Sequence, residues 1–257
     1  MASRPMAAST VRGNPVETPI LHLLGGPYVT VAGKRREVPE GSKRLLAFVA
    51  LHPMPVRRRR VAGSIWPDAD EVRASGNLRS ALWRLRTAGI HLVSADKSAL
   101  ALSERVRVDV RAVSEWASRL IRGQYELGDL TIPPRALEAL DLLPGWYDDW
   151  VMLERERLRQ RVLHALEALS CHLTAMGRWA EAVEVAMTAV AAEPLRESAQ
   201  RTLIDAHLAE GNWVEARRTY ETYRNLLWNE LGVEPAPDLS AKVAAPLGGG
   251  WRRSHPA

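Results

Sequence analysis

A six-residue motif occurs twice in the second half of the chain, 34 residues apart, and it constrains the fold more than any other feature. The sequence reads GRWAEA at 177–182 and GNWVEA at 211–216. Self-similarity at a fixed short period indicates a stack of similar units, because one such unit cannot bury its apolar face alone. The spacing therefore predicts helical hairpins that pack on one another.

Each copy contains the residues that two closely packed antiparallel helices need. Gly177 and Gly211 allow a sharp turn between helices, and Ala182 and Ala216 allow the helices to approach closely. We expect the tryptophan of each copy to fill the groove between its helices. A period of 34 residues is that of the tetratricopeptide repeat. Aromatic residues follow the second copy where this repeat has small ones, so we expect that copy to pack differently, as a terminal unit.

The rest of the chain beyond Val110 is also predicted to be helical. Apolar residues recur every three or four positions, as on one face of a helix, for example at Leu158, Val162, Leu166, Leu169 and Leu173. No run in this half alternates convincingly in the manner of a strand. We therefore expect the second half to be all α.

The first half combines short strands with three helices. Residues 20–38 alternate β-forming runs with glycine turns and predict two or three small antiparallel strands. Three helices are predicted. The first covers residues 42–52, with Ser42 as N-cap, the second begins at the arginine run 57–60 and stops at Pro67, and the third runs from Ser75 to Thr87. A β-hairpin follows the third helix. This order of elements is that of a winged helix-turn-helix.

The predicted fold is mainly α with a small antiparallel β component. A winged helix-turn-helix domain is followed by an all-α, tetratricopeptide-like helical domain. We assign the first domain to residues 20–110 and the second to residues 111–244. Residues 1–19 and 245–257 are expected to be flexible tails.

Charge is distributed unevenly between the two halves. Residues 21–115 contain 17 Lys and Arg against 9 Asp and Glu, whereas residues 116–257 contain 16 against 20. Such a change of sign along the chain suggests a basic module for a polyanion joined to an acidic module with another role. Ordinary solvent-exposed faces produce a weaker version of the same pattern, so polyanion binding also requires a suitable sequence motif.

The third helix has one narrow apolar stripe, which should pack on the other two helices. At 100° per residue this stripe is formed by Leu78, Ala81, Leu82 and Leu85. Small or flat side chains lie opposite the stripe, with arginines beside them: Ser80, Trp83 and Thr87, then Arg79 and Arg86 on one edge and Arg84 on the other. That arrangement suits a helix in a major groove, where central residues meet base edges and flanking cations meet phosphates.

These arginines have no acidic residue four positions away, so no intrahelical ion pair at that spacing neutralises them. Further cations lie at the starts of the first two helices and at the hairpin tip, and they extend the predicted surface. The predicted DNA-binding residues are Lys43, Arg44, Arg58, Arg59, Arg60, Asn77, Arg79, Ser80, Trp83, Arg84, Arg86, Thr87 and Lys97.

Several stretches together resemble the bacterial antibiotic regulatory proteins of the SARP family, in which an OmpR-like winged helix precedes a bacterial transcriptional activator domain. In the first half they are SKRLLAFVALH, VAGSIWPD, NLRSALWRLR and VRVDV. In the second half they are LLPGWYDDWVMLERERLRQ, EPLRESAQRTLIDAHLAEGNWVEA and NELGVEP. The resemblance covers residues 20–244.

The resemblance implies a transcriptional activator that binds tandem direct repeats of double-stranded DNA near promoters and recruits RNA polymerase holoenzyme. A homodimer is implied at least on DNA, and a secondary-metabolite gene cluster is the implied target. The third helix would enter the major groove, and the hairpin around Lys97 would reach the adjacent minor groove. Larger relatives add a nucleotide-binding domain, and we expect this chain to be a two-domain member without one.

Enzyme motifs are absent from the sequence. We find no H-E-x-x-H pair, no complete glycine-rich phosphate loop and no G-x-S-x-G elbow, so we predict no catalytic residue, no cofactor and no metal ligand. The alternative to an activator is a tetratricopeptide-like interaction module whose basic front domain binds an acidic protein. The salt dependence of DNA binding separates the two.

The compartment is predicted from what the sequence lacks. No apolar run reaches 18 residues, so we expect no membrane association through a spanning helix. The one cysteine, Cys171, cannot form an intramolecular disulfide, and its apolar surroundings predict a small buried side chain. We expect a cytoplasmic protein associated with the nucleoid.

Overall fold

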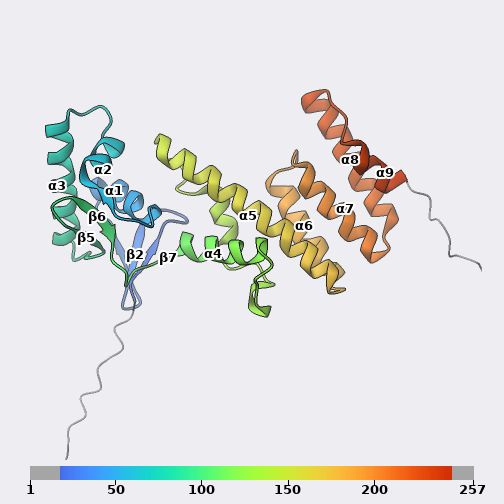
Figure 1. The fold of residues 1–257 in the computed structure, drawn as a ribbon, viewed down its shortest axis with the longest axis horizontal. Helices are drawn as coiled ribbons and strands as arrows, with labels where there is room; N and C mark the ends of the chain where they lie inside the picture. The colour runs from blue at the N-terminus through green and yellow to red at the C-terminus, as the bar shows by residue number, and fades with distance from the viewer. Residues whose placement is uncertain (1–17, 245–257) are drawn as a thin grey trace, which may run out of the picture. The chain divides into compact units, whose positions relative to one another are not determined.

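A computed structural model describes residues 18–244 and divides the chain into two compact units (Figure 1). The first unit contains the chain up to Ala112 together with Leu142–Met152, and the second contains Val113–Asp141 and the chain from Leu153 onward. Apart from residues 18 and 19, the two predicted tails lie outside the described residues.

The first unit contains two small sheets and three helices. Its elements are β1 (Ile20–His22), β2 (Tyr28–Val31), β3 (Lys34–Glu37), α1 (Glu40–Leu51), β4 (Val56–Arg57), α2 (Arg58–Ile65), α3 (Glu71–Thr87), β5 (Val93–Ala95), β6 (Ala99–Leu102) and β7 (Arg107–Val108). One sheet has the order β3-β2-β1-β7, with β1 and β7 parallel and the other pairs antiparallel. The other has the order β4-β6-β5 and is antiparallel.

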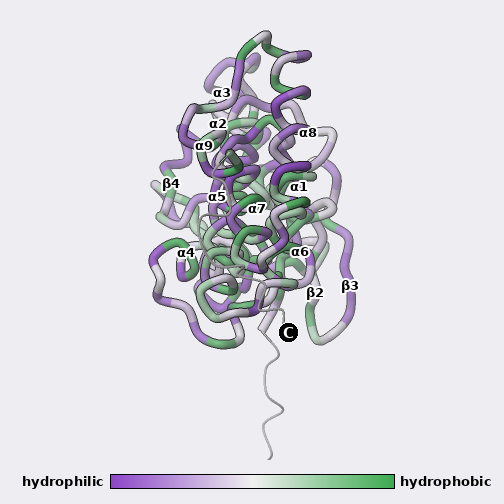
Figure 2. Tube along the Cα trace, turned by 90° about the vertical axis from the view of Figure 1, so that its right-hand side faces the viewer, coloured by the Kyte–Doolittle hydropathy of each residue, from purple (hydrophilic) through white to green (hydrophobic). Residues whose placement is uncertain are grey.

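The order of these elements confirms the predicted winged helix-turn-helix. The predicted hairpin is formed by β5 and β6, and β4 joins it as a third strand just before α2. The edge strand β3 is exposed at all four positions and is a hydrophilic segment in Figure 2. The apolar stripe of α3 is buried as predicted, since Leu78, Ala81, Leu82 and Leu85 are at most 8% exposed.

Two helix starts differ from the prediction. Helix α1 begins at Glu40 after Pro39, and Ser42 is a buried residue inside the helix rather than its N-cap. The Ser42 hydroxyl instead donates to the carbonyl oxygen of Ala81 at 2.9 Å, which links α1 to α3. Helix α3 begins at Glu71, earlier than the predicted Ser75, because the Asp70 side chain caps it by accepting from the backbone N–H of Arg73 at 2.8 Å.

The segment Leu142–Met152 packs in the first unit, although the sequence assigned all of 111–244 to the helical domain. The ring of Trp150 meets the ring of Phe48 edge on, with centroids 5.1 Å apart. Asp148 accepts a hydrogen bond from Arg44 at 3.2 Å, and the Arg44 guanidinium lies 5.8 Å from the ring centroid of Trp146. The winged-helix unit is therefore built from two stretches of sequence.

The second unit contains helices and no strand among the residues that the structure describes. Its elements are α4 (Asp109–Ile121), the 3-10 helices η1 (Leu127–Asp129) and η2 (Ala136–Asp141), α5 (Asp149–Ala175), α6 (Trp179–Ala192), α7 (Glu197–Glu210), α8 (Trp213–Leu231) and α9 (Pro237–Ala244), where the first residues of α4 and α5 belong to the first unit. The predicted class, a winged helix-turn-helix followed by an all-α helical domain, is confirmed. In the described range we find no helix both long and apolar enough to cross a bilayer.

The 34-residue repeat forms two helical hairpins, α5–α6 and α7–α8. Gly177 and Gly211 have φ angles of +74° and +84°, which favour glycine at the two sharp turns. Ala182 and Ala216 are fully buried, as predicted. The prediction for Trp179 is wrong, since its side chain is 43% exposed. The buried stripe of α6 is centred about 70° away from it on the helix.

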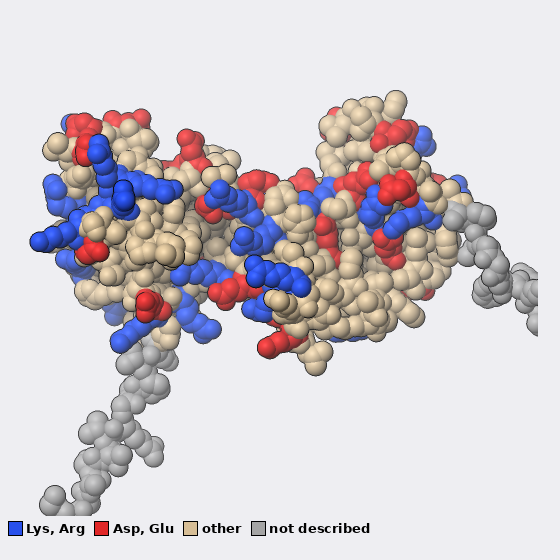
Figure 3. Space-filling model, viewed as in Figure 1, with Lys and Arg blue, Asp and Glu red and all other residues tan. Residues whose placement is uncertain are grey.

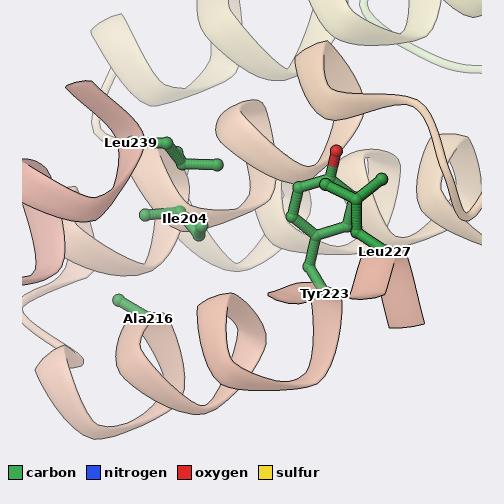
Figure 4. Close-up of a cluster of buried hydrophobic side chains, with 5 residues drawn as sticks. All are labelled: Ile204, Ala216, Tyr223, Leu227 and Leu239. Atoms are coloured by element: carbon green, nitrogen blue, oxygen red, sulfur yellow. The ribbon is translucent and has the colours of Figure 1, made fainter. Parts of the chain in front are cut away.

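The terminal repeat accommodates bulky residues because the short helix α9 closes it. Figure 4 shows the buried cluster formed by Ile204, Ala216, Tyr223, Leu227 and Leu239. Tyr223 is 2% exposed, and burial raises the pKa of its hydroxyl, with the neighbouring Glu197 adding to the effect. An aromatic side chain therefore fills a space that small residues leave in a standard repeat.

Cys171 is exposed on α5, so the prediction of a buried cysteine is wrong. It lies about 200° around the helix from Leu169, and therefore off the apolar stripe. Partial desolvation, together with the charges of Asp205 and Glu167, raises the pKa of its thiol. The reactive thiolate form is therefore disfavoured.

Candidate nucleic-acid interface

The outward face of α3 has the residue types that the sequence predicted. Trp83 is 66% exposed, and Arg79, Ser80, Arg86 and Thr87 are exposed around it. Asn77, near the middle of the helix, is half-buried. Because the opposite stripe is anchored in the core, this face is presented by a fixed helix rather than by a loop.

Arginines from two helices meet in a hollow of about 220 Å³ on this face, which we call the α3 hollow. Its lining consists of Arg58, Arg79, Leu82, Trp83, Arg86 and Ala95, from α2, α3 and β5. Figure 3 shows Lys and Arg side chains gathered over the first unit. The sequence predicted Arg58 as a DNA-binding residue, but only the fold shows that it lies beside Arg79 and Arg86.

The hairpin tip is tightly held. The Asp96 carboxylate accepts from the N–H of Ala99 at 2.7 Å and from the N–H and hydroxyl of Ser98 at 2.6 and 2.8 Å. These hydrogen bonds, led by that from Ala99, lower the pKa of Asp96. The exposed Lys97 is thus presented by an ordered turn. Sequence reasoning overlooked Asp96, although an aspartate two residues before a serine in a turn is a recognisable signal.

Arg58 braces this hairpin. Its guanidinium donates to the carbonyl oxygen of Asp96 at 3.1 Å, and its backbone N–H donates to that of Ser98 at 2.9 Å. Two hydrogen bonds therefore connect the start of α2 to the hairpin tip. Arg58 lines the α3 hollow while it holds the hairpin in place.

The sequence predicted that Arg84 lies on one edge of the outward face of α3, free to contact phosphate, and the structure differs. Arg84 is half-buried, and its guanidinium donates to the carbonyl oxygen of Gly41 in α1 at 3.1 Å. A Cβ atom at residue 41 would lie 2.8 Å from the Arg84 Nη2, so the missing side chain of glycine makes room for this contact. The long arginine side chain reaches the first turn of α1 and stabilises the packing of α3.

Three other predicted cations have acidic partners within the unit. Lys43 lies 2.6 Å from Glu40, Arg59 lies 2.9 Å from Glu71, and Arg44 pairs with Asp148 as described above. Within residues 18–244, no ion pair is formed by the remaining cations of the set: Arg58, Arg60, Arg79, Arg84, Arg86 and Lys97. Within the predicted set, the cations without an ion pair in the described residues therefore lie on α2, α3 and the hairpin.

The chemistry of the face is that of an anion-binding surface with an aromatic side chain at its centre. Guanidinium groups form paired hydrogen bonds with phosphates, and a tryptophan offers a flat apolar surface to a sugar or a base. No group of three His, Cys, Asp or Glu side chains suited to a metal ion occurs in the described range.

A winged helix-turn-helix with such a face, followed by helical repeats, defines the class of transcription regulators. Comparison with known families agrees: residues 94–245, more than half of the chain, match the bacterial transcriptional activator domain. The chain belongs to this family, and the resemblance to the SARP regulators is confirmed.

Two curated relatives are similar to this chain. The regulatory protein AfsR of Streptomyces griseus is 38% identical over 103 residues, which are 40% of this chain and 10% of that protein. AfsR of Streptomyces coelicolor is 31% identical over 218 residues, 77% of this chain and 21% of that protein. The chain therefore spans about a fifth or less of the length of these relatives.

One solved structure has a similar fold. Mycobacterium tuberculosis EmbR, determined in complex with a low affinity phosphopeptide, superposes with a TM-score of 0.68 at 20% identity. The match covers 88% of this chain and 64% of the EmbR chain. At this identity the likeness concerns the fold.

Proposed function

We propose that this regulator is a sequence-specific DNA-binding transcriptional activator that binds tandem direct repeats near promoters. The observation that carries the proposal is the α3 hollow, where Arg79 and Arg86, which form no ion pair in the described range, lie with Arg58 around Trp83. Desolvating such a cluster of like charges is unfavourable unless an anion neutralises it. The regularly spaced phosphates of duplex DNA supply that anion.

In this proposal α3 lies in the major groove and the β5–β6 hairpin reaches the adjacent minor groove. Arg79 and Arg86 contact phosphates, and Lys97 extends the contact along the backbone. Ser80 and Thr87 face base edges, and Trp83 packs on a sugar or a thymine methyl group. Arg84 positions α3 from behind instead of contacting phosphate, because it is engaged with Gly41.

The second unit would supply the remaining steps of activation. We propose that it contacts RNA polymerase holoenzyme and supports a homodimer on DNA, with a secondary-metabolite gene cluster under its control. The protein would act in the cytoplasm, at the nucleoid. The family membership and the regulatory relatives support this assignment. The proposal requires no catalytic residue, cofactor or metal ion.

Footprinting tests this proposal. The full chain should protect DNA upstream of the genes that neighbour its own, at two short sites in the same orientation. Protection of two sites is expected because side-by-side subunits on direct repeats place two α3 helices in successive major grooves. Absence of protection on every promoter-proximal fragment at low salt would contradict the proposal.

The second candidate function is an interaction module whose basic first unit binds an acidic protein. It is favoured by the helical repeats, which commonly bind peptides. It predicts that affinity for duplex DNA is weak and does not depend on sequence, so the footprinting experiment separates it from the activator.

A further inference from the structure

A second hollow, of about 690 Å³, lies on the first unit, and we call it the α2 hollow. Its lining consists of His52, Pro53, Met54, Pro55, Val56, Arg57, Arg59 and Arg60. These residues form the loop after α1, the strand β4 and the first turn of α2. No residue of this lining is acidic.

The arginine run 57–60 is divided between the two hollows. Arg58 lines the α3 hollow, whereas Arg57, Arg59 and Arg60 line the α2 hollow. Neighbouring residues of a helix point about 100° apart, so one basic run can supply two surfaces. The proposed DNA contacts of α3 and the hairpin therefore leave three of these four arginines unexplained.

Part of the lining of the α2 hollow is apolar and exposed. Met54 is 72% exposed between two exposed prolines, whose fixed φ angles stiffen the loop. The loop is also held at its base, since Arg111 donates to the carbonyl oxygen of Ala50 at 3.1 Å and the His52 ring stacks on Phe48. An exposed methionine on a stiff loop is suited to binding apolar side chains, because its own side chain is adaptable.

The other side of the α2 hollow is strongly positive. Helix α2 begins after Arg57, no side chain caps it, and its first turn contains no acidic residue. The positive end of the helix dipole is therefore added to the charge of the arginines. Arg59 forms an ion pair with Glu71, but Arg57 and Arg60 form no ion pair within residues 18–244. Carboxylates would be bound favourably here.

We infer that the α2 hollow binds an acidic segment of a partner protein that also carries an apolar side chain. The carboxylates pair with Arg57 and Arg60, and the apolar side chain packs on Met54 and its neighbouring prolines. Charge complementarity favours an acidic partner, and the exposed Met54 between its prolines favours a peptide over a DNA backbone, which has no apolar side chain to place there. The inference adds a protein partner to the proposed DNA-binding function.

Fluorescence anisotropy with two labelled 12-residue peptides tests the inference on the full chain. One peptide alternates Asp and Leu, and the other alternates Asp and Gly, so their charges are equal. The Asp-Leu peptide should bind at least tenfold more tightly than the Asp-Gly peptide. Met54→Ser should weaken the Asp-Leu peptide about fivefold and leave the Asp-Gly peptide unchanged, because it removes only apolar contact.

Matched variants locate the site. Arg57→Ala combined with Arg60→Ala should weaken binding of both peptides, whereas Val72→Ser, at a side chain that is 80% exposed and does not line the hollow, should change neither affinity by more than twofold. Arg79→Ala combined with Arg86→Ala should also leave the peptides unaffected, which excludes the α3 hollow as their site.

Four results would overturn the inference, and three of them concern the peptides: equal affinity for the two peptides, no effect of Met54→Ser on the Asp-Leu peptide, or weaker binding of that peptide to the Arg79 and Arg86 variant. A fourth is that Met54→Ser weakens duplex DNA binding more than twofold, since the hollow would then belong to the DNA surface. The peptides are measured without DNA, so failure of the inference is distinguishable from failure of the proposed DNA binding.

Discussion

Within the described residues, most arginines of the second unit form an ion pair, whereas most arginines of the first unit do not, Arg44 and Arg59 being among the exceptions. In the second unit arginines are paired within the fold: Arg119 with Asp129, Arg178 with Glu181, Arg196 with Glu167, Arg201 with Asp238 and Arg224 with Glu234. In the first unit Arg60, Arg79 and Arg86 have no ion pair within the described residues. The comparison teaches that the presence of an internal acidic partner, rather than the number of arginines, separates a structural cation from a candidate ligand-binding one.

The largest expected effect is on DNA affinity in the first unit. Arg79→Ala combined with Arg86→Ala should raise the Kd for a protected promoter duplex about 100-fold, because each charge-assisted contact contributes at least about 1.5 kcal/mol. Electrophoretic mobility shift or anisotropy at fixed salt measures this. The thermal midpoint should hardly change, since neither side chain is paired inside the fold.

The matched control comes from the second unit. Arg217→Ala removes an exposed arginine that pairs with Glu221 at 2.9 Å, and it should leave DNA affinity within twofold. If Arg217→Ala weakened DNA binding as much as the α3 variant, the claim that unpaired arginines bind DNA and paired ones do not would be contradicted.

A smaller effect, on stability, is expected for a paired arginine of the second unit. Arg119 donates two hydrogen bonds of 2.7 Å to Asp129, which is 8% exposed, and this pairing lowers the pKa of the aspartate. Asp129→Asn should lower the free energy of unfolding by about 1–2 kcal/mol at neutral pH, measured by urea denaturation. DNA affinity should be unchanged.

The pH dependence of that effect has a defined sign. Because the folded pKa of Asp129 lies below its ordinary value of 3.8, the stabilisation is fully present above that value and is lost as pH falls through the lowered pKa. The difference between the wild-type protein and Asp129→Asn should therefore disappear in strong acid. A difference that persists there would show that the charge of Asp129 is not its source.

Arg84 provides an intermediate case within the first unit. Arg84→Ala removes the hydrogen bond to Gly41 and should cost about 1 kcal/mol of unfolding free energy. The salt dependence of DNA binding should stay as in the wild-type protein, because Arg84 contacts α1 rather than phosphate. A reduced salt dependence in this variant would show that Arg84 contacts phosphate, as the sequence alone predicted.

The smallest expected effect is at the hairpin tip. Lys97→Ala should weaken DNA binding about fivefold at physiological salt, the contribution of one released counterion. Ser94→Ala, at an exposed position on β5, is the matched control and should have no effect beyond twofold. Equal losses in both variants would mean that the hairpin acts by its shape and not by the charge of Lys97.

Local patterns predicted most of the fold. The 34-residue repeat located Gly177, Gly211 and the buried alanines, and the spacing of Leu78 to Leu85 predicted which face of α3 is buried. Both follow from helical periodicity, which is a local property. Asp70 as the cap of α3 was also open to prediction, but the apolar pattern begins near Ser75 and indicates a later start.

Contacts between distant segments could not be predicted in the same way. Arg44 and Asp148 are more than 100 residues apart, and nothing in either stretch indicates the other. Arg84 resembled Arg79 and Arg86 in the sequence, and only the closeness of Gly41 distinguishes it. The division of the run 57–60 between two hollows likewise depends on the directions of side chains in the folded unit.

The most direct test of the central claim is the slope of log Kobs against log salt concentration for the full chain on its promoter duplex. Three phosphate contacts by Arg79, Arg86 and Lys97 predict a slope of about −2.7 or steeper. Arg79→Ala combined with Arg86→Ala should make it shallower by about 1.8, whereas Arg217→Ala should not change it. A flat response, or a slope that the α3 variant leaves unchanged, would contradict the claim that these unpaired arginines bind phosphate.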